Sequence, residues 1–367
     1  MNLLFRTVSV ACVSLAASAA WVAPAGAQPT QVSIPADRDW AHQWTPMTFP
    51  ARIDGFEREA VTAYEERETN ISARYFDTRT QTILSLYIYR PGNPSTAIWF
   101  DRALGAVGAG GSLGTIDRED QKISRFVPSG GSAPSGLSAV LKVEGGQYRS
   151  TGVALYRAGE WLVKVRITSG EQSVSQLDVS LREVLADLPA LDGIGSDAAQ
   201  FVTVCERPLA FGETAPVEPT MTDALAMAFM ADLTGALARG ETDKVQVDAQ
   251  SSVRTCREGD WNAQYNIYRT DGDASRYSLV MGDSGASIEV FPLLGLSQAE
   301  DRPTHAVSSA TGLETKFHTP FRGLPNIGPA SQSAFRGPVY VRVSRKLSED
   351  ESPRITIASG LESETDD

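Results

Sequence analysis

Three short runs rich in apolar residues constrain the fold of this chain more than any other feature. They cover 137–143, 152–157 and 161–167, and glycine-containing turns separate them. In the third run, Lys164 and Arg166 alternate with tryptophan, valine and isoleucine. A period of two residues is typical of a strand with one buried and one hydrated face. We therefore expect an antiparallel meander whose hydrated face carries Lys164 and Arg166.

Helical periodicity is found on both sides of this meander. Leucine and valine recur on one stripe at 176–188, where Pro189 ends the pattern, and a shorter apolar helix is expected at 97–107. The strongest helical pattern, at 222–239, ends at Gly240. Further β-rich runs lie at 71–75, 83–89, 201–205, 261–269, 277–281, 287–291 and 339–343. The mixture predicts an α+β protein in which helices cover antiparallel sheets.

The N-terminal residues indicate export. One arginine, an apolar run and a small-residue cleavage site give residues 1–27 the organisation of a secretory signal peptide. The remaining chain is long enough for two ordinary domains. We place them at 28–195 and 196–346, each an antiparallel sheet with covering helices. The acidic residues 347–367 are expected to form a disordered tail.

Charge and composition limit the partners of the chain. Its net charge is −12 at pH 7, so nucleic acid and anionic lipid surfaces should repel it. Beyond the signal we expect no transmembrane segment. The three histidines lack the spacing of metal ligands, and we expect neither a metal nor a cofactor. The acidic residues between 117 and 120 are interpreted as a solvated turn rather than an acid–base pair.

The cysteines point to one covalent cross-link. Cys205 and Cys256 are the two that remain beyond the signal peptide. In an oxidising compartment, an even pair favours a structural disulfide. Two separate buried thiols are the alternative.

One motif raises the question of catalysis. Residues 282–285 read Gly-Asp-Ser-Gly, which matches the surroundings of the nucleophile in chymotrypsin-like serine proteases. That chemistry needs a histidine base, and His42 lacks the flanking residues of that family. A tight turn between two strands explains the same residues. A secreted hydrolase using Ser284 is therefore the alternative to a non-catalytic protein.

A basic segment provides the candidate binding residues. Residues 302–346 carry seven basic side chains and one acidic one, whereas the tail that follows is strongly acidic. Turn formers and aromatics are mixed in its middle, which predicts a long ordered loop, and such loops often hold functional sites. We expect an anionic ligand to bind there, with the tail screening it. The candidate ligand-binding residues are Lys316, His318, Phe321, Arg322 and Arg336.

The order of elements over residues 40–190 resembles the PsbP-like α+β fold. The shared features are an apolar lead-in, a hairpin, a helix, a three-stranded meander and a final amphipathic helix. Because members of that fold are mostly accessory or binding proteins, the resemblance implies such a role but transfers no site residue. We expect a periplasmic or secreted, non-catalytic binding or envelope-accessory protein, with an anionic ligand or an envelope protein as its partner. A purely structural envelope protein is a third interpretation.

Overall fold

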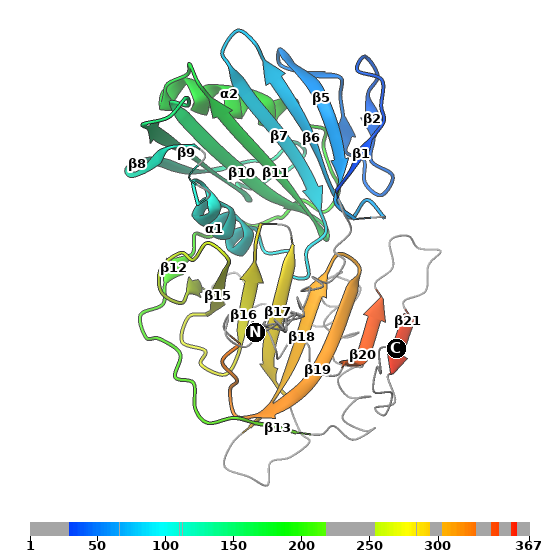
Figure 1. Ribbon diagram of the computed structural model, residues 1–367, viewed down its shortest axis with the longest axis vertical. Coiled ribbons are helices and arrows are strands. Elements are labelled where there is room, and N and C mark those ends of the chain that lie inside the picture. The colour runs from blue at the N-terminus through cyan, green and yellow to red at the C-terminus, as the bar shows by residue number, and fades with distance from the viewer. Residues whose placement is uncertain are drawn as a thin grey trace, which may run out of the picture.

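The computed structural model describes residues 29–65, 67–109, 111, 113–217, 254–283, 285–293, 303–327, 339–344 and 354–357. Within them the chain forms two large sheets, one above the other in Figure 1, and a small two-stranded ribbon. The helices of this part of the chain are α1 (Thr96–Ala106) and α2 (Val174–Asp187), and both pack against strands of the first sheet. The expected α+β class, with helices covering each sheet, is therefore wrong, because the described structure is mostly β.

The first sheet has nine strands in the order β1-β5-β6-β7-β11-β10-β9-β8, with β4 also paired to β5. All of these pairs are antiparallel. The expected meander forms β9 to β11, and the expected hairpin forms β6 and β7. The strand bounds are β1 (Thr30–Val32), β4 (Arg52–Ile53), β5 (Phe56–Ala63), β6 (Asn70–Asp77), β7 (Thr82–Tyr89), β8 (Thr115–Phe126), β9 (Gly136–Glu144), β10 (Ser150–Ala158) and β11 (Trp161–Ser169). The ribbon consists of β2 (Trp40–Ala41) and β3 (Thr48–Phe49).

Helix α2 covers one face of the first sheet. Ser173 caps its first turn, and its side chain accepts a hydrogen bond from the backbone of Gln176. Leu177, Leu181 and Leu185 recur at four-residue spacing and are buried against the sheet. The strands direct every second side chain to this face, so one large hydrophobic core lies beneath the helix.

Helix α1 covers part of the opposite face and also contacts the second sheet (Figure 1). Trp99 of α1 belongs to a hydrophobic cluster that includes Tyr268 and Val280 of the second sheet. At Gly105, an added Cβ would lie 2.5 Å from the Trp261 ring, so only glycine allows this close approach. The two sheets therefore share a continuous apolar contact.

The second sheet has ten strands in the order β12-β14-β15-β16-β17-β18-β19-β20-β21, with β13 paired to β19. Its pairs are antiparallel except for β12 with β14, which is parallel. The apolar residues of one face, among them Tyr277, Leu279 and Ile288, form its core. The strand bounds are β12 (Thr203–Val204), β13 (Ala215–Pro216), β14 (Thr255–Arg257), β15 (Tyr265–Thr270), β16 (Tyr277–Met281), β17 (Ala286–Pro292), β18 (Thr304–Thr311), β19 (Glu314–Arg322), β20 (Val339–Ser344) and β21 (Arg354–Ile357).

Several local expectations need correction or stay open. The solvated turn expected between 117 and 120 lies inside β8, although a bulge interrupts its pairing with β9 there. The strongest expected helix, 222–239, lies outside the described residues, as does most of the acidic tail. Residues 354–357 of the expected disordered tail instead form β21, which pairs with β20. None of the helices in the described part of the chain is long and apolar enough to cross a membrane.

Candidate functional site

The basic segment singled out from the sequence forms a strand rather than a loop. His318 to Arg322 are the second half of β19, where β18 pairs on one side and β13 pairs with Phe321 and Arg322 on the other. The Lys316 Nζ lies 3.0 Å from Glu314 Oε2. The imidazole of His318 is 3 % exposed, and its Nε2 lies 2.8 Å from Ser309 Oγ. Strand pairing therefore overrides the turn-forming residues of this segment.

A β-bulge divides the expected ligand-binding residues between the two faces of this sheet. The register between β18 and β19 shifts within the segment, so His318 and Phe321 lie on one face and Arg322 on the other. Phe321 packs against the core of the second sheet, whereas Arg322 is exposed. Arg336 lies outside the described residues. The structure places Lys316 close to His318 but separates Arg322 from them.

The Gly-Asp-Ser-Gly stretch forms the connection between β16 and β17. Ser284 itself is outside the described residues, but its two neighbours contact the first sheet. The Lys164 Nζ donates to the Asp283 carbonyl oxygen at 2.8 Å and lies 2.9 Å from Asp283 Oδ2. The Gly92 N–H donates to the Gly285 carbonyl oxygen at 3.2 Å. The connection therefore docks the second sheet onto the first.

This docking explains why the expected hydrated face is wrong at Lys164, which is 3 % exposed. Burial lowers the pKa of Lys164, and the Asp283 carboxylate opposes that shift. The Nζ also lies 4.4 Å from the ring centre of Tyr87. Arg166, two residues along β11, stays half-buried and lies 3.7 Å from the same carboxylate.

A second polar network joins α1 to the second sheet. Asp101 accepts two hydrogen bonds from Arg257 Nη1, at 2.6 and 2.9 Å, and one from the Tyr268 hydroxyl at 2.9 Å. The neighbouring Arg102 donates to the carbonyl oxygens of Asn262 and Ala263. Burial, together with the negative charge of Asp101, raises the pKa of Tyr268. These buried contacts fix the position of one sheet relative to the other.

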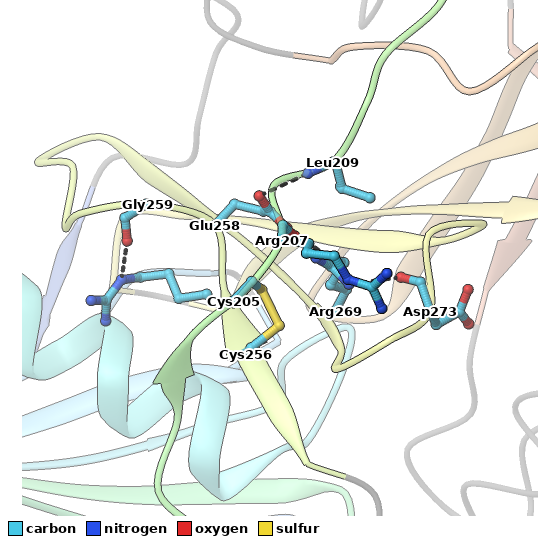
Figure 2. The surroundings of a disulfide bond; sticks show 9 residues. Cys205, Arg207, Leu209, Cys256, Glu258, Gly259, Arg269 and Asp273 are labelled. Atoms are coloured by element: carbon cyan, nitrogen blue, oxygen red, sulfur yellow. Dashed lines mark hydrogen bonds and ion pairs between the residues drawn. A yellow bond between two sulfur atoms is a disulfide. The ribbon is translucent and has the colours of Figure 1, made fainter.

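The predicted disulfide between Cys205 and Cys256 is confirmed (Figure 2). It fastens the linking segment, residues 188–209, which follows α2 and leads from the first sheet to the second. The bond joins the residue after β12 to the middle of β14. Beside it, Glu258 accepts hydrogen bonds from the Leu209 N–H at 3.1 Å and from Arg269 Nε at 2.5 Å. The linking segment is therefore held to the second sheet by covalent and charge-assisted contacts.

A groove of about 740 Å³ lies where this segment leaves the first sheet. Arg125 of β8 and Arg254, the residue before β14, bring cationic groups to it from the two sheets. The Arg125 Nε donates to the Ala199 carbonyl oxygen at 2.5 Å, and its Cζ lies 4.5 Å from the ring centre of Phe201. Asp197 is the one acidic residue of the lining. The groove thus combines two guanidinium groups with an aromatic ring.

Exposed apolar side chains gather beside this groove. Of the five large ones in the described part of the chain, four lie on β8, just after it, or on the linking segment. They are Ile123 (37 % exposed), Val127 (54 %), Phe201 (38 %) and Val204 (51 %), while the fifth, Val179, lies on α2. Because soluble proteins rarely expose contiguous apolar patches without a partner, this grouping marks an interaction surface.

A smaller hollow of about 370 Å³, beside β1 and β5, has a different character. Its one cation, Arg58, is buried and donates to three backbone carbonyl oxygens, those of Phe49, Pro35 and Arg38. These internal bonds hold the lead-in segment against the first sheet. The cation of this hollow therefore has a structural role, which leaves the groove between the sheets as the stronger candidate.

Sequence reasoning missed the residues of this groove. Arg125 belongs to a β8 segment in which Ile123, Arg125 and Val127 alternate with polar or inward-facing residues. The charged residues at 117–120, just before that segment, favoured a solvated turn, so the alternation that follows them was not interpreted as a strand. Arg254 had no detectable signal, because the groove forms only when the two sheets dock.

Comparisons of the chain with protein-family models, with curated proteins and with solved structures find no match. The resemblance to the PsbP-like fold stays a prediction.

Proposed function

We propose that this chain is an exported, non-catalytic binding protein, periplasmic or secreted, that holds an anionic partner in the groove between its two sheets. The observation that supports this most directly is the convergence of Arg125 and Arg254 on one groove. The chain as a whole has a net charge of −12. A positively charged groove on such a molecule attracts anions locally, while the rest of the surface repels them.

The supports of the groove favour binding with little rearrangement. The disulfide between Cys205 and Cys256 fixes the linking segment, and the buried pair of Asp101 and Arg257 fixes the sheets. A preorganised site loses less conformational entropy when its partner binds. The disulfide also supports an oxidising compartment, as expected for an exported protein.

The histidines favour binding over hydrolysis. His42, His305 and His318 are each at most 3 % exposed. The His42 Nε2, for example, lies 3.0 Å from the Glu68 carbonyl oxygen. A general base must reach the proton that it removes from a substrate, and these imidazoles are enclosed by structural contacts. Labelling by a fluorophosphonate probe that Ser284→Ala abolishes would replace this proposal with a hydrolase.

Binding of a fluorescein-labelled hexaglutamate, followed by anisotropy at low and at physiological salt, tests the proposal. Exposed ion pairs contribute about 0.2 to 1 kcal/mol each, so replacing Arg125 and Arg254 by glutamine should weaken binding about tenfold. The matched control replaces the exposed Arg52 and Arg149, which lie away from the groove, by glutamine. It changes the net charge equally and should bind as the wild type does. Equal losses in both variants, or no binding at all, would contradict the proposal.

A further inference from the structure

The outer edge of β8 offers backbone hydrogen bonds beside the groove. This strand ends the first sheet, so among the described strands only β9 pairs with it (Figure 1). After the bulge, Lys122 to Phe126 pair regularly with β9. Alternate N–H and C=O groups of a regular edge point outward, where an extended chain can pair with them. This half of β8 is therefore a geometrically intact template for one more strand.

The side chains of this edge are arranged for an extended partner. Ile123, Arg125 and Val127 follow one another at two-residue spacing, so they share one side of the extended chain. The two apolar side chains are 37 % and 54 % exposed. Side chains that face each other across a strand pair lie about 4.5 to 5.5 Å apart. An added strand would therefore place apolar residues beside Ile123 and Val127, and an acidic residue beside Arg125.

The surroundings of Arg125 fix its direction. Its bond to the Ala199 carbonyl oxygen and its contact with the Phe201 ring hold the guanidinium at the groove, which Arg254 also lines. An arginine that is already immobilised loses less side-chain entropy on binding a carboxylate. A second copy of this chain fits less well than a separate peptide, because each copy carries a net charge of −12.

We infer that the partner is an extended peptide segment that adds as a strand to the outer edge of β8. It carries apolar and acidic side chains in turn at every second residue, so that both kinds lie on the side shared by Ile123, Arg125 and Val127. This inference rests on the proposed anion-binding role of the groove and specifies its partner. Main-chain hydrogen bonds would supply affinity, and the alternating contacts at Ile123, Arg125 and Val127 would supply specificity.

Backbone methylation of the peptide tests this mode without changing the fold of the protein. The probe is a fluorescein-labelled decapeptide in which valine and glutamate take turns at every second position and serine fills the positions between them. It is compared with two versions that carry N-methyl groups either on the serines or on the valines and glutamates. In a strand, one set of N–H groups faces the neighbouring strand and the other faces away. One methylated peptide should therefore bind at least about tenfold more weakly, while the other keeps the affinity of the parent.

Variants of the protein supply the second readout. Replacing Ile123 and Val127 by serine should weaken binding of the parent peptide several-fold, and Val179→Ser, at the exposed apolar residue on α2, should leave it unchanged. Equal binding of all three peptides, combined with the loss caused by replacing Arg125 and Arg254, would overturn strand addition but keep the anion-binding proposal. Equal binding of the peptides to wild type and to that arginine variant would overturn both. Dimers of the chain that the Ile123 and Val127 replacements dissociate would show that a second copy occupies the edge.

Discussion

Glu289 couples the stability of this protein to pH at the contact between the sheets. It lies on β17, in register with Ser278 of β16 and Ser308 of β18. The side chain of Asn93, in the connection between β7 and α1, also forms a hydrogen bond with Glu289. The Ser278 hydroxyl donates to Oε2, while Oε1 is shielded from solvent and has no partner among the described atoms. Burial raises the pKa of Glu289 to about 7, and the hydrogen bonds from Ser278 and Asn93 oppose that shift.

The direction in which pH changes the free energy of unfolding follows from how tightly Glu289 binds its proton in the folded and in the unfolded chain. The pKa of Glu289 is higher in the folded than in the unfolded chain, so the folded chain binds the proton more tightly. This difference stabilises the folded state fully at pH values below the unfolded pKa, here 4.5. That contribution is lost as the pH rises from 4.5 through about 7. The difference in pKa corresponds to about 3 kcal/mol, at about 1.4 kcal/mol for each unit. Above pH 7 the folded protein therefore holds an ionised carboxylate in an unfavourable environment.

Replacing Glu289 by glutamine should remove this pH dependence. Urea denaturation at pH 4, 5, 6, 7 and 8 gives the free energy of unfolding of each variant. We expect the difference between Glu289→Gln and the wild type to shift towards the variant by up to about 3 kcal/mol between pH 4 and pH 8. The exposed Glu171→Gln is the control and should show no such shift. A difference that stays constant across this range for Glu289→Gln would refute the reasoning.

Three further perturbations test the supports and the charge of the groove. Asp101→Asn leaves Arg257 buried without its anionic partner and should lower the free energy of unfolding by about 3 to 5 kcal/mol in urea, and a loss below 1 kcal/mol would contradict the role given to that pair. Without residues 1–27, which contain Cys12, the protein should show no free thiol when it is unfolded in the absence of reductant, and replacing Cys205 and Cys256 by serine should cost about 4 kcal/mol for a loop of 51 residues, whereas two reactive thiols would argue against the bond. Deleting residues 358–367, which follow β21 and carry four acidic residues and no basic one, should tighten binding of hexaglutamate at low salt but not at high salt, and unchanged affinity at low salt would show that they do not compete for the groove.

The elements that could be predicted from the sequence are those with an uninterrupted local pattern. In the meander, β9 and β10 are rich in apolar residues and β11 alternates apolar with polar ones, while α2 shows an apolar face at helical spacing and α1 is apolar over most of its length. The disulfide followed from counting cysteines. In each case the residues that determine the structure lie close together in the sequence, or the number of alternatives is small.

The elements that were missed depend on contacts between distant segments. The acidic stretch at 117–120 and Pro320 of β19 both argue against strands locally. Their structure is determined instead by pairing with β9 for the first and with β18 and β13 for the second. Lys164 has the pattern of a hydrated residue and becomes buried only when Asp283 of the second sheet docks on it. Because Arg125 and Arg254 are far apart in the sequence and meet across the same contact, no local pattern could have placed the groove.

The most direct test of the proposed binding site is photo-crosslinking from an acidic peptide. The decapeptide of valine, serine and glutamate used above, with a benzophenone group on its central residue, is irradiated with the full chain, and cross-linked positions are found by mass spectrometry. We expect cross-links at Ile123 to Val127 and at Gln200 to Val204, reduced in the variant that lacks Arg125 and Arg254. Cross-links concentrated instead on β18 to β20, around Lys316 and His318, would contradict the site proposed between the sheets.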